Sequence, residues 1–171
     1  MNDKYDYILG IDPDIEKGGF SLLDVNCKAF EFVSALSFVQ GIKSIDALAA
    51  RGGRILVVIE DSDTSTNWHI QRLLYSSQPI ESKLRTAAAI GRSAGLCHAT
   101  ARLLREYAES CGLDVLMQKP LKKCWRGQDG KITQAEAEYF MQGLPKRCNQ
   151  ECRDSALIAW VVAGLPVRVK V

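Results

Sequence analysis

Two short apolar runs that each end in an acidic residue constrain the fold of this chain most strongly. One run, Ile-Leu-Gly-Ile, ends at Asp12, and the other, Ile-Leu-Val-Val-Ile, ends at Glu60. Such runs are typical of strands, and the second, rich in β-branched residues, suits a central strand that is buried on both faces. If the two strands are adjacent and parallel, both carboxylates lie at one sheet edge, where open α/β sheets usually carry their chemistry.

The remaining pattern predicts a mixed sheet covered by helices. We expect strands at 6–11, 19–25, 29–33, 55–59 and 113–117, the first three in hairpin order. We expect the main helices at 37–50, 82–110, 133–142 and 149–163, with a shorter one around 68–75. Right-handed crossovers then give an α/β fold with a five-stranded sheet of order 3-2-1-4-5, in which strand 2 is antiparallel. Residues 1–171 are expected to form a single domain.

The last of these helices adds two acids, Glu151 and Asp154, in the segment Glu-Cys-Arg-Asp-Ser-Ala-Leu-Ile. Their spacing of three places them on one helical face, and apolar residues from Leu157 onward turn that face toward the protein. Each acid alone also fits a cap, a turn or a helix-dipole role. Together with the two strand-end acids, however, they make an oxygen-rich cluster that favours Mg²⁺ or Mn²⁺ over zinc. We predict two ions, about 4 Å apart, acting on a phosphodiester.

Charge is distributed unevenly along the chain. Its 22 Lys and Arg residues nearly balance its 20 Asp and Glu residues, but acids dominate 1–64 and bases dominate 83–131. An acidic pocket rimmed by positive charge suits a metal-dependent enzyme that acts on a phosphate backbone. The chain has no apolar run long enough to span a membrane and begins with polar residues, so we expect a cytoplasmic protein with free cysteines.

Five segments carry a family resemblance. They are ILGIDPDIEKGGFSLLD, VVIED, AAAIGRSAGLCHATARLL, PLKKCWRG with GKITQAEA, and ECRDSALIAW. In this order, spanning nearly the whole chain, they resemble the motifs of RuvC-type Holliday-junction resolvases, in the ribonuclease H-like (retroviral integrase) superfamily. The resemblance implies a ribonuclease H-like fold and a Mg²⁺-dependent endonuclease that cuts branched DNA, above all four-way junctions. Junction resolution needs two cuts related by a two-fold axis, so we expect a homodimer.

The resemblance also implies roles for individual residues. It implies a metal-binding catalytic set of four acids: Asp12, Glu60, Glu151 and Asp154. It implies that Lys122 and Lys131 contact the scissile phosphate and its neighbours. We expect Lys123 and Arg126 to hold the flanking DNA backbone, and Trp68 and Trp125 to stack on bases or sugars. Packing is the alternative role for Trp68.

Two departures from the family pattern leave the function open. Asp14 stands where the family usually has Gly, and Glu151 stands where Asp is commoner. A catalytically weak or inactive nucleic-acid-binding module is therefore the main alternative. A nucleotide binder like actin or the sugar kinases is a third reading, but it requires a second Gly-rich phosphate motif and a much longer chain. Cys148 and Cys152 have a zinc-compatible spacing without a second ligand pair, so we expect no zinc site.

The helix expected at 82–110 carries a face of small residues that includes Gly91 and Gly95. Such a narrow face allows close packing on a sheet. The same helix, with Leu103 and Leu104, is the expected dimer face.

Overall fold

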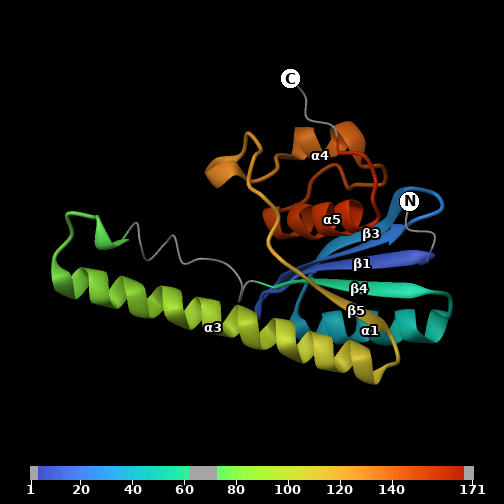
Figure 1. Cartoon of the computed structure of the whole chain (residues 1–171), viewed down its shortest axis with the longest axis horizontal. Coiled ribbons are helices and arrows are strands. Elements are labelled where there is room, and N and C mark those ends of the chain that lie inside the picture. Colours follow the sequence, from blue (N-terminus) through green and yellow to red (C-terminus); the bar gives the residue numbers. More distant parts are fainter. Residues whose placement is uncertain (1–3, 62–72, 168–171) are drawn as a thin grey trace.

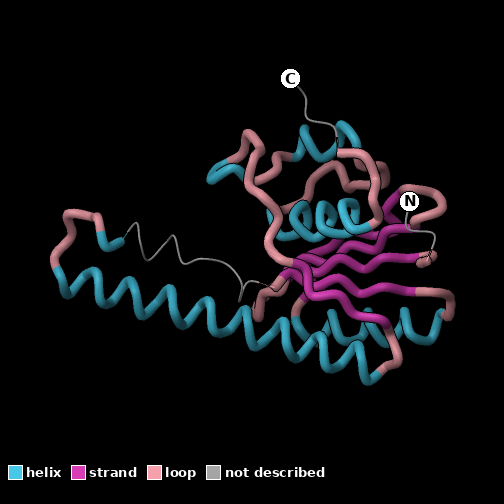
Figure 2. The backbone as a smooth tube through the Cα atoms, in the orientation of Figure 1, coloured by secondary structure: helices cyan, strands magenta, loops and turns pink. Residues whose placement is uncertain are grey.

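The computed structural model describes residues 4–61 and 73–167, which form one five-stranded sheet with helices on both faces (Figures 1 and 2). The strands are β1 (Tyr7–Asp12), β2 (Gly18–Asp24), β3 (Ala29–Leu36), β4 (Ile55–Glu60) and β5 (Asp114–Gln118). The helices are α1 (Phe38–Arg51), α3 (Ile80–Ser110), the short 3₁₀ helix η2 (Gln128–Gly130), α4 (Gln134–Phe140) and α5 (Gln150–Val162).

The sheet has the order β3-β2-β1-β4-β5, as predicted. β2 runs antiparallel to β1 and β3, whereas β1, β4 and β5 are parallel. Within the β1–β4 pair, Gly10 is opposite Val58 and Ile11 is opposite Ile59. Asp12 and Glu60 directly follow this last pair, so the two strand-end acids are neighbours, as their positions in the sequence predicted.

Strand alternation divides the interior into two hydrophobic cores, one on each face of the sheet. Ile8, Leu23 and Val58 belong to the core under α5, while Leu9 and Leu22 belong to the core against α1 and α3. Side chains two residues apart on a strand point to the same face. In Figure 1, α4 and α5 lie on one side of the sheet, and α1 and α3 lie on the other.

Sequence capping signals set two of the helix starts. Thr133 and Glu136 form a capping box at the start of α4, and the Asn149 side chain accepts a hydrogen bond from the Cys152 backbone N–H at the start of α5. α4 ends earlier than expected, at Phe140, because Met141 adopts an extended conformation. The next residue, Gln142, forms a bridge with Ala29 beside the sheet.

The small-residue face of α3 does not pack on the sheet around Gly91 and Gly95, although its residues would allow close packing. Among the described residues, nothing lies within 4 Å of the position that a Cβ would take at Gly91 or Gly95. The buried residues of α3 all lie in its C-terminal part, from Thr100 to Ala108, and the N-terminal part extends past the sheet (Figure 2). Leu104 is buried in the core and is therefore not available to a dimer face, whereas Leu103 is exposed.

No helix in the described ranges is long and apolar enough to cross a membrane.

Candidate active site

Asp12 and Glu60 point to the α5 side of the sheet. Asp12 continues the face of Ile8 and Gly10 on β1, and Glu60 continues the face of Leu56 and Val58 on β4. Because the strands are adjacent and parallel, both carboxylates reach the same edge on the same face. Strand register and alternation thus bring these acids together before any side-chain contact is considered.

Helix α5 brings the other acids to this edge by lying unusually close to the sheet. A Cβ on Gly10 would lie 2.2 Å from the carbonyl oxygen of Ser155, and one on Gly19 would lie 1.9 Å from that of Glu151. The buried hydroxyls of Ser21 on β2 and Ser155 on α5 are 2.6 Å apart and hydrogen-bonded. Glycine is therefore required at both strand positions, because any side chain there would push α5 and its acids away from the strand ends.

A cavity of about 120 Å³ lies at this edge. It is lined by acids (Asp12, Glu60, Asp154), lysines (Lys122, Lys123, Lys131), Pro120, Gly130 and apolar side chains (Leu121, Trp125, Ile132, Leu157, Ile158). Glu151 is not among the lining residues, although its charge acts on Asp12. The structure therefore brings three of the four predicted acids into one cavity and places Glu151 nearby.

The acids of the cavity destabilise one another's charged forms. Burial raises the pKa of Asp12 well above its ordinary value, and the nearby charges of Glu60 and Asp154 raise it further. Burial, followed by repulsion from Asp154, likewise raises the pKa of Glu60. Both groups would gain from a cation that neutralises their charge.

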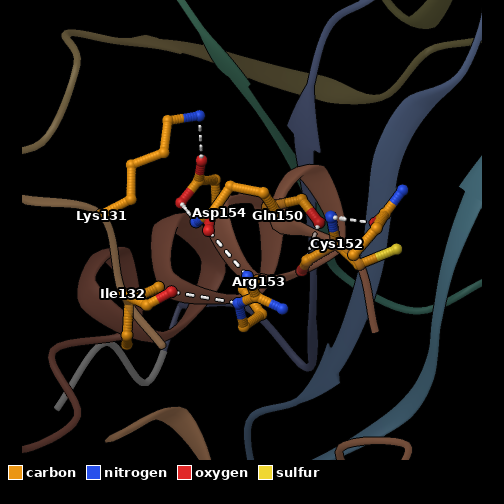
Figure 3. A network of polar contacts seen from close by, with 8 residues as sticks. Lys131, Ile132, Gln150, Cys152, Arg153 and Asp154 are labelled. Carbon is orange, nitrogen blue, oxygen red and sulfur yellow. Dashed lines mark hydrogen bonds and ion pairs between the residues drawn. The ribbon is translucent and has the colours of Figure 1, made fainter. Parts of the chain in front are cut away.

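Lys131 supplies one such cation within the protein itself. Its Nζ lies 3.0 Å from Oδ2 of Asp154 (Figure 3). Burial opposes the charge on Lys131, but attraction to Asp154, Asp12 and Glu151 outweighs it and raises the pKa of the lysine. The acid cluster therefore already accommodates one positive charge beside Asp154.

The donor set fits a hard divalent cation in its chemistry. The clustered acidic groups offer carboxylate oxygens, which suit Mg²⁺ or Mn²⁺, and the ammonium of Lys131 already lies beside one of them. In 4–61 and 73–167, no group of three or more His, Cys, Asp or Glu side chains is arranged so that it could hold a metal ion as it stands.

The basic segment after β5 borders the cavity as a defined loop. Lys122 and Lys123 line the cavity beside Lys131, whereas Arg126 does not. The backbone N–H of Arg126 donates to Oε1 of Glu136 at 3.1 Å, and the backbone N–H and hydroxyl of Thr133 also donate to the Glu136 carboxylate. Although burial opposes it, these bonds lower the pKa of Glu136. The Thr133–Glu136 spacing is typical of a capping box, but it does not indicate that Glu136 also anchors this loop.

Several other predicted groups have specific placements. Trp125 lines the cavity and stacks on Phe140, with ring centroids 5.8 Å apart, so Phe140 already occupies one face of its indole. Asp14 makes a turn, because its Oδ1 accepts the backbone N–H groups of Glu16 and Lys17 at 2.8 and 3.3 Å. Trp68 lies outside the described residues, as does most of the short helix expected at 68–75.

Comparison with known proteins gives matches only among solved structures. No family model and no curated protein matches the chain. T. thermophilus RuvC in complex with a Holliday junction substrate aligns with a TM-score of 0.52 and 13% identity, covering 92% of this chain and 96% of that one. The large terminase nuclease from thermophilic phage G20c aligns with a TM-score of 0.36 and 15% identity, covering 94% and 83%, which is too weak to support an argument. The protein therefore has the ribonuclease H-like fold of RuvC.

Proposed function

We propose that this protein is a divalent-metal-dependent endonuclease that hydrolyses phosphodiester bonds in branched DNA, with the four-way junction as its main substrate. The observation that carries the proposal is the cavity in which Asp12, Glu60 and Asp154 face Lys122 and Lys131 at one sheet edge. The shared fold with RuvC, whose compared structure holds a Holliday junction substrate, supports the choice of DNA substrate. The whole chain, 1–171, would act as one nuclease domain.

In this proposal the four acids hold the metal. Asp12, Glu60 and Asp154 supply carboxylate oxygens directly, and Glu151 acts from the edge of the cluster. Two bound Mg²⁺ or Mn²⁺ ions would supply an activated water and stabilise the leaving oxygen. Buried apolar side chains, including Leu157 and Ile158, form part of the cavity wall and strengthen the charge interactions next to them.

The lysines of the cavity act on the substrate rather than on the metal. A phosphodiester above the carboxylates carries negative charge on its non-bridging oxygens, and that charge grows in the transition state. The ammonium groups of Lys122 and Lys131 would stabilise it, and the partly buried Lys131 would contribute a few kcal/mol. Lys123 and Arg126, which are exposed like Lys122, would bind the flanking backbone, with Trp125 bordering the same path.

Resolution of a four-way junction requires two symmetric cuts, so the active species would be a homodimer with one cavity in each subunit. Light scattering of the purified protein at micromolar concentration would test this directly. A monomer both alone and on a junction would contradict symmetric resolution while leaving single-strand cleavage possible.

The test of the function is a cleavage assay with four substrates: a four-way junction, a flap, a plain duplex and an RNA–DNA hybrid, each with and without Mg²⁺. We expect Mg²⁺-dependent cuts in the junction and little cleavage of the duplex. Preferential cutting of the hybrid would instead assign a ribonuclease H-type activity. Equal cleavage with and without chelator would contradict the metal requirement.

One observation favours the alternative of a binding module without strong catalysis. Lys131 already pairs with Asp154, one of the proposed metal ligands. In a binding module this ion pair would be permanent, and divalent cations would not displace it. Junction binding that is unaffected by Mn²⁺, combined with the absence of cleavage, would support this alternative.

A further inference from the structure

Asp154 is held from two sides by side chains of different kinds (Figure 3). Lys131 binds its Oδ2, and Nε2 of Gln150 donates to its Oδ1 at 2.7 Å. The other end of the same amide, Oε1 of Gln150, accepts from Nη2 of Arg153 at 2.7 Å. The first turn of α5 therefore contains a continuous path from the Arg153 guanidinium, through the Gln150 amide, to the Asp154 carboxylate.

The chemistry of the three groups fixes the direction of this path. A guanidinium only donates hydrogen bonds and a carboxylate only accepts them, so the amide between them must present oxygen to Arg153 and nitrogen to Asp154. The Asp154 carboxylate attracts the amide nitrogen and repels the amide oxygen, and Arg153 binds the other end of the amide, so the Gln150 side chain is held in this orientation from both ends. Because the donor is charged, its bond also polarises the amide and strengthens the second bond.

Arg153 is itself fixed by the backbone on either side of the site. Its Nε donates to the carbonyl oxygen of Ile132 at 3.0 Å, and its Nη1 donates to that of Cys148. Ile132 is fully buried and directly follows Lys131. The same side chain thus connects the segment that carries Lys131 to the helix that carries Asp154, the two partners of the central ion pair.

We propose that Arg153 and Gln150 are positioning residues for the metal site: Arg153 orients the Gln150 amide, which holds Oδ1 of Asp154, while Oδ2 is bonded to the cavity-lining Lys131. This inference rests on the proposed function, since it takes Asp154 to be a metal ligand. With Oδ1 held by Gln150, Oδ2 would exchange the Lys131 ammonium for a metal ion at little conformational cost to the carboxylate. Loss of a residue that orients a metal ligand typically weakens metal affinity about 10- to 100-fold.

The experiment titrates Mn²⁺ alone into the DNA-free protein by isothermal titration calorimetry, with a thermal melt of each variant. Gln150→Met keeps the size of the side chain and removes both amide bonds. Arg153→Lys keeps the charge and removes the planar fork. We expect each to raise the Mn²⁺ dissociation constant about tenfold or more.

Gln134→Met is the matched control. Gln134 is also a hydrogen-bonded glutamine, but its partners are Glu138, Pro145 and the backbone N–H of Cys148, which donates to its Oε1, rather than Asp154. We expect its thermal stability to fall without a change in Mn²⁺ affinity. If this control weakens Mn²⁺ binding as much as Gln150→Met does, general loosening of the chain around Cys148 explains the effect. The proposed positioning of Asp154 by Arg153 and Gln150 is then wrong.

The double variant tests whether Arg153 acts through Gln150. We expect Arg153→Lys to add little to the loss of Mn²⁺ affinity that Gln150→Met already causes. If the two losses are additive, Arg153 does not act through Gln150 and the proposal is overturned. Gln150→Met tests the proposal even if Arg153→Lys does not fold. Unchanged Mn²⁺ affinity in Gln150→Met also overturns the proposal. Failure of the wild type to bind Mn²⁺ would overturn the proposed metal site, and with it the positioning role of Arg153 and Gln150.

Discussion

Replacing Gly19 by alanine tests how closely α5 must approach β2 for the acids to meet. The added Cβ would lie 1.9 Å from the carbonyl oxygen of Glu151, whereas real Cβ atoms essentially never approach within 3.0 Å of another heavy atom. The helix and the strand must therefore separate by at least about 1 Å at this point. Overpacking of this kind typically costs about 1–3 kcal/mol of the free energy of unfolding.

The same displacement would move Glu151 away from the strand ends and disturb Asp154 one turn later. A misplacement of about 1 Å can reduce an enzymatic rate about 100-fold. We therefore expect Gly19→Ala to lower the urea midpoint, weaken Mn²⁺ binding and reduce junction cleavage by about two orders of magnitude.

Gly91→Ala is the control for this substitution. Gly91 lies within α3 and has open space around its Cβ position among the described residues, so alanine there should stabilise the protein by about 0.5–1 kcal/mol through helix propensity. Both variants are measured by urea denaturation at constant pH. If Gly19→Ala has the same urea midpoint and the same Mn²⁺ affinity as the wild type, the close approach of α5 to β2 is not needed for stability or for the metal site.

Two further predictions concern charge. Because burial and the neighbouring acids raise the pKa of Asp12 in the folded state, the Asp12 carboxyl keeps its proton in the folded protein above about pH 4, where the unfolded chain has lost it. In the metal-free protein Asp12 should therefore contribute a loss of stability as the pH rises from there, and Asp12→Asn should remove this contribution; the same pH dependence of the urea midpoint in chelator for wild type and Asp12→Asn would contradict this. In the basic loop, Lys122→Ala and Lys131→Ala should strongly slow single-turnover cleavage at saturating protein. Lys123→Ala and Arg126→Ala should mainly weaken DNA binding, and each should reduce the slope of log binding constant against log salt concentration by about one phosphate contact's worth. Equal cleavage rates for all four variants would mean that the loop has no catalytic role.

The parts of the fold that could be predicted depend on short-range rules. Hairpin order and right-handed crossovers predict the strand order, and alternation along β1 and β4 places Asp12 and Glu60 on one face. The placement of α3 could not be predicted in the same way, because its small residues allow close packing but do not require it. Only its C-terminal part has a sheet to cover, and this depends on where β4 and β5 end.

The contacts that hold Asp154 in place could not be predicted from the sequence pattern either. Gln150 and Arg153 are polar residues in the first turn of a helix, where solvent exposure is the ordinary expectation. Their role depends on the backbone carbonyl of Ile132, which the chain brings beside α5 from a distant loop. Leu103 and Leu104 show the same limit, since one is exposed and its neighbour is buried in the core.

The most direct test of the central claim compares the wild type with Asp154→Asn in single-turnover assays on a four-way junction. Asparagine keeps the size of the side chain but removes the charge that a metal ligand requires, and its amide nitrogen cannot accept one of the two hydrogen bonds that Lys131 and Gln150 donate. Binding depends mainly on lysine and arginine contacts to phosphates, so it should remain, while Mg²⁺-dependent cleavage should be abolished. Full cleavage by Asp154→Asn, or no cleavage by the wild type in Mg²⁺ or Mn²⁺, would contradict the assignment of this cavity as a metal-dependent nuclease site.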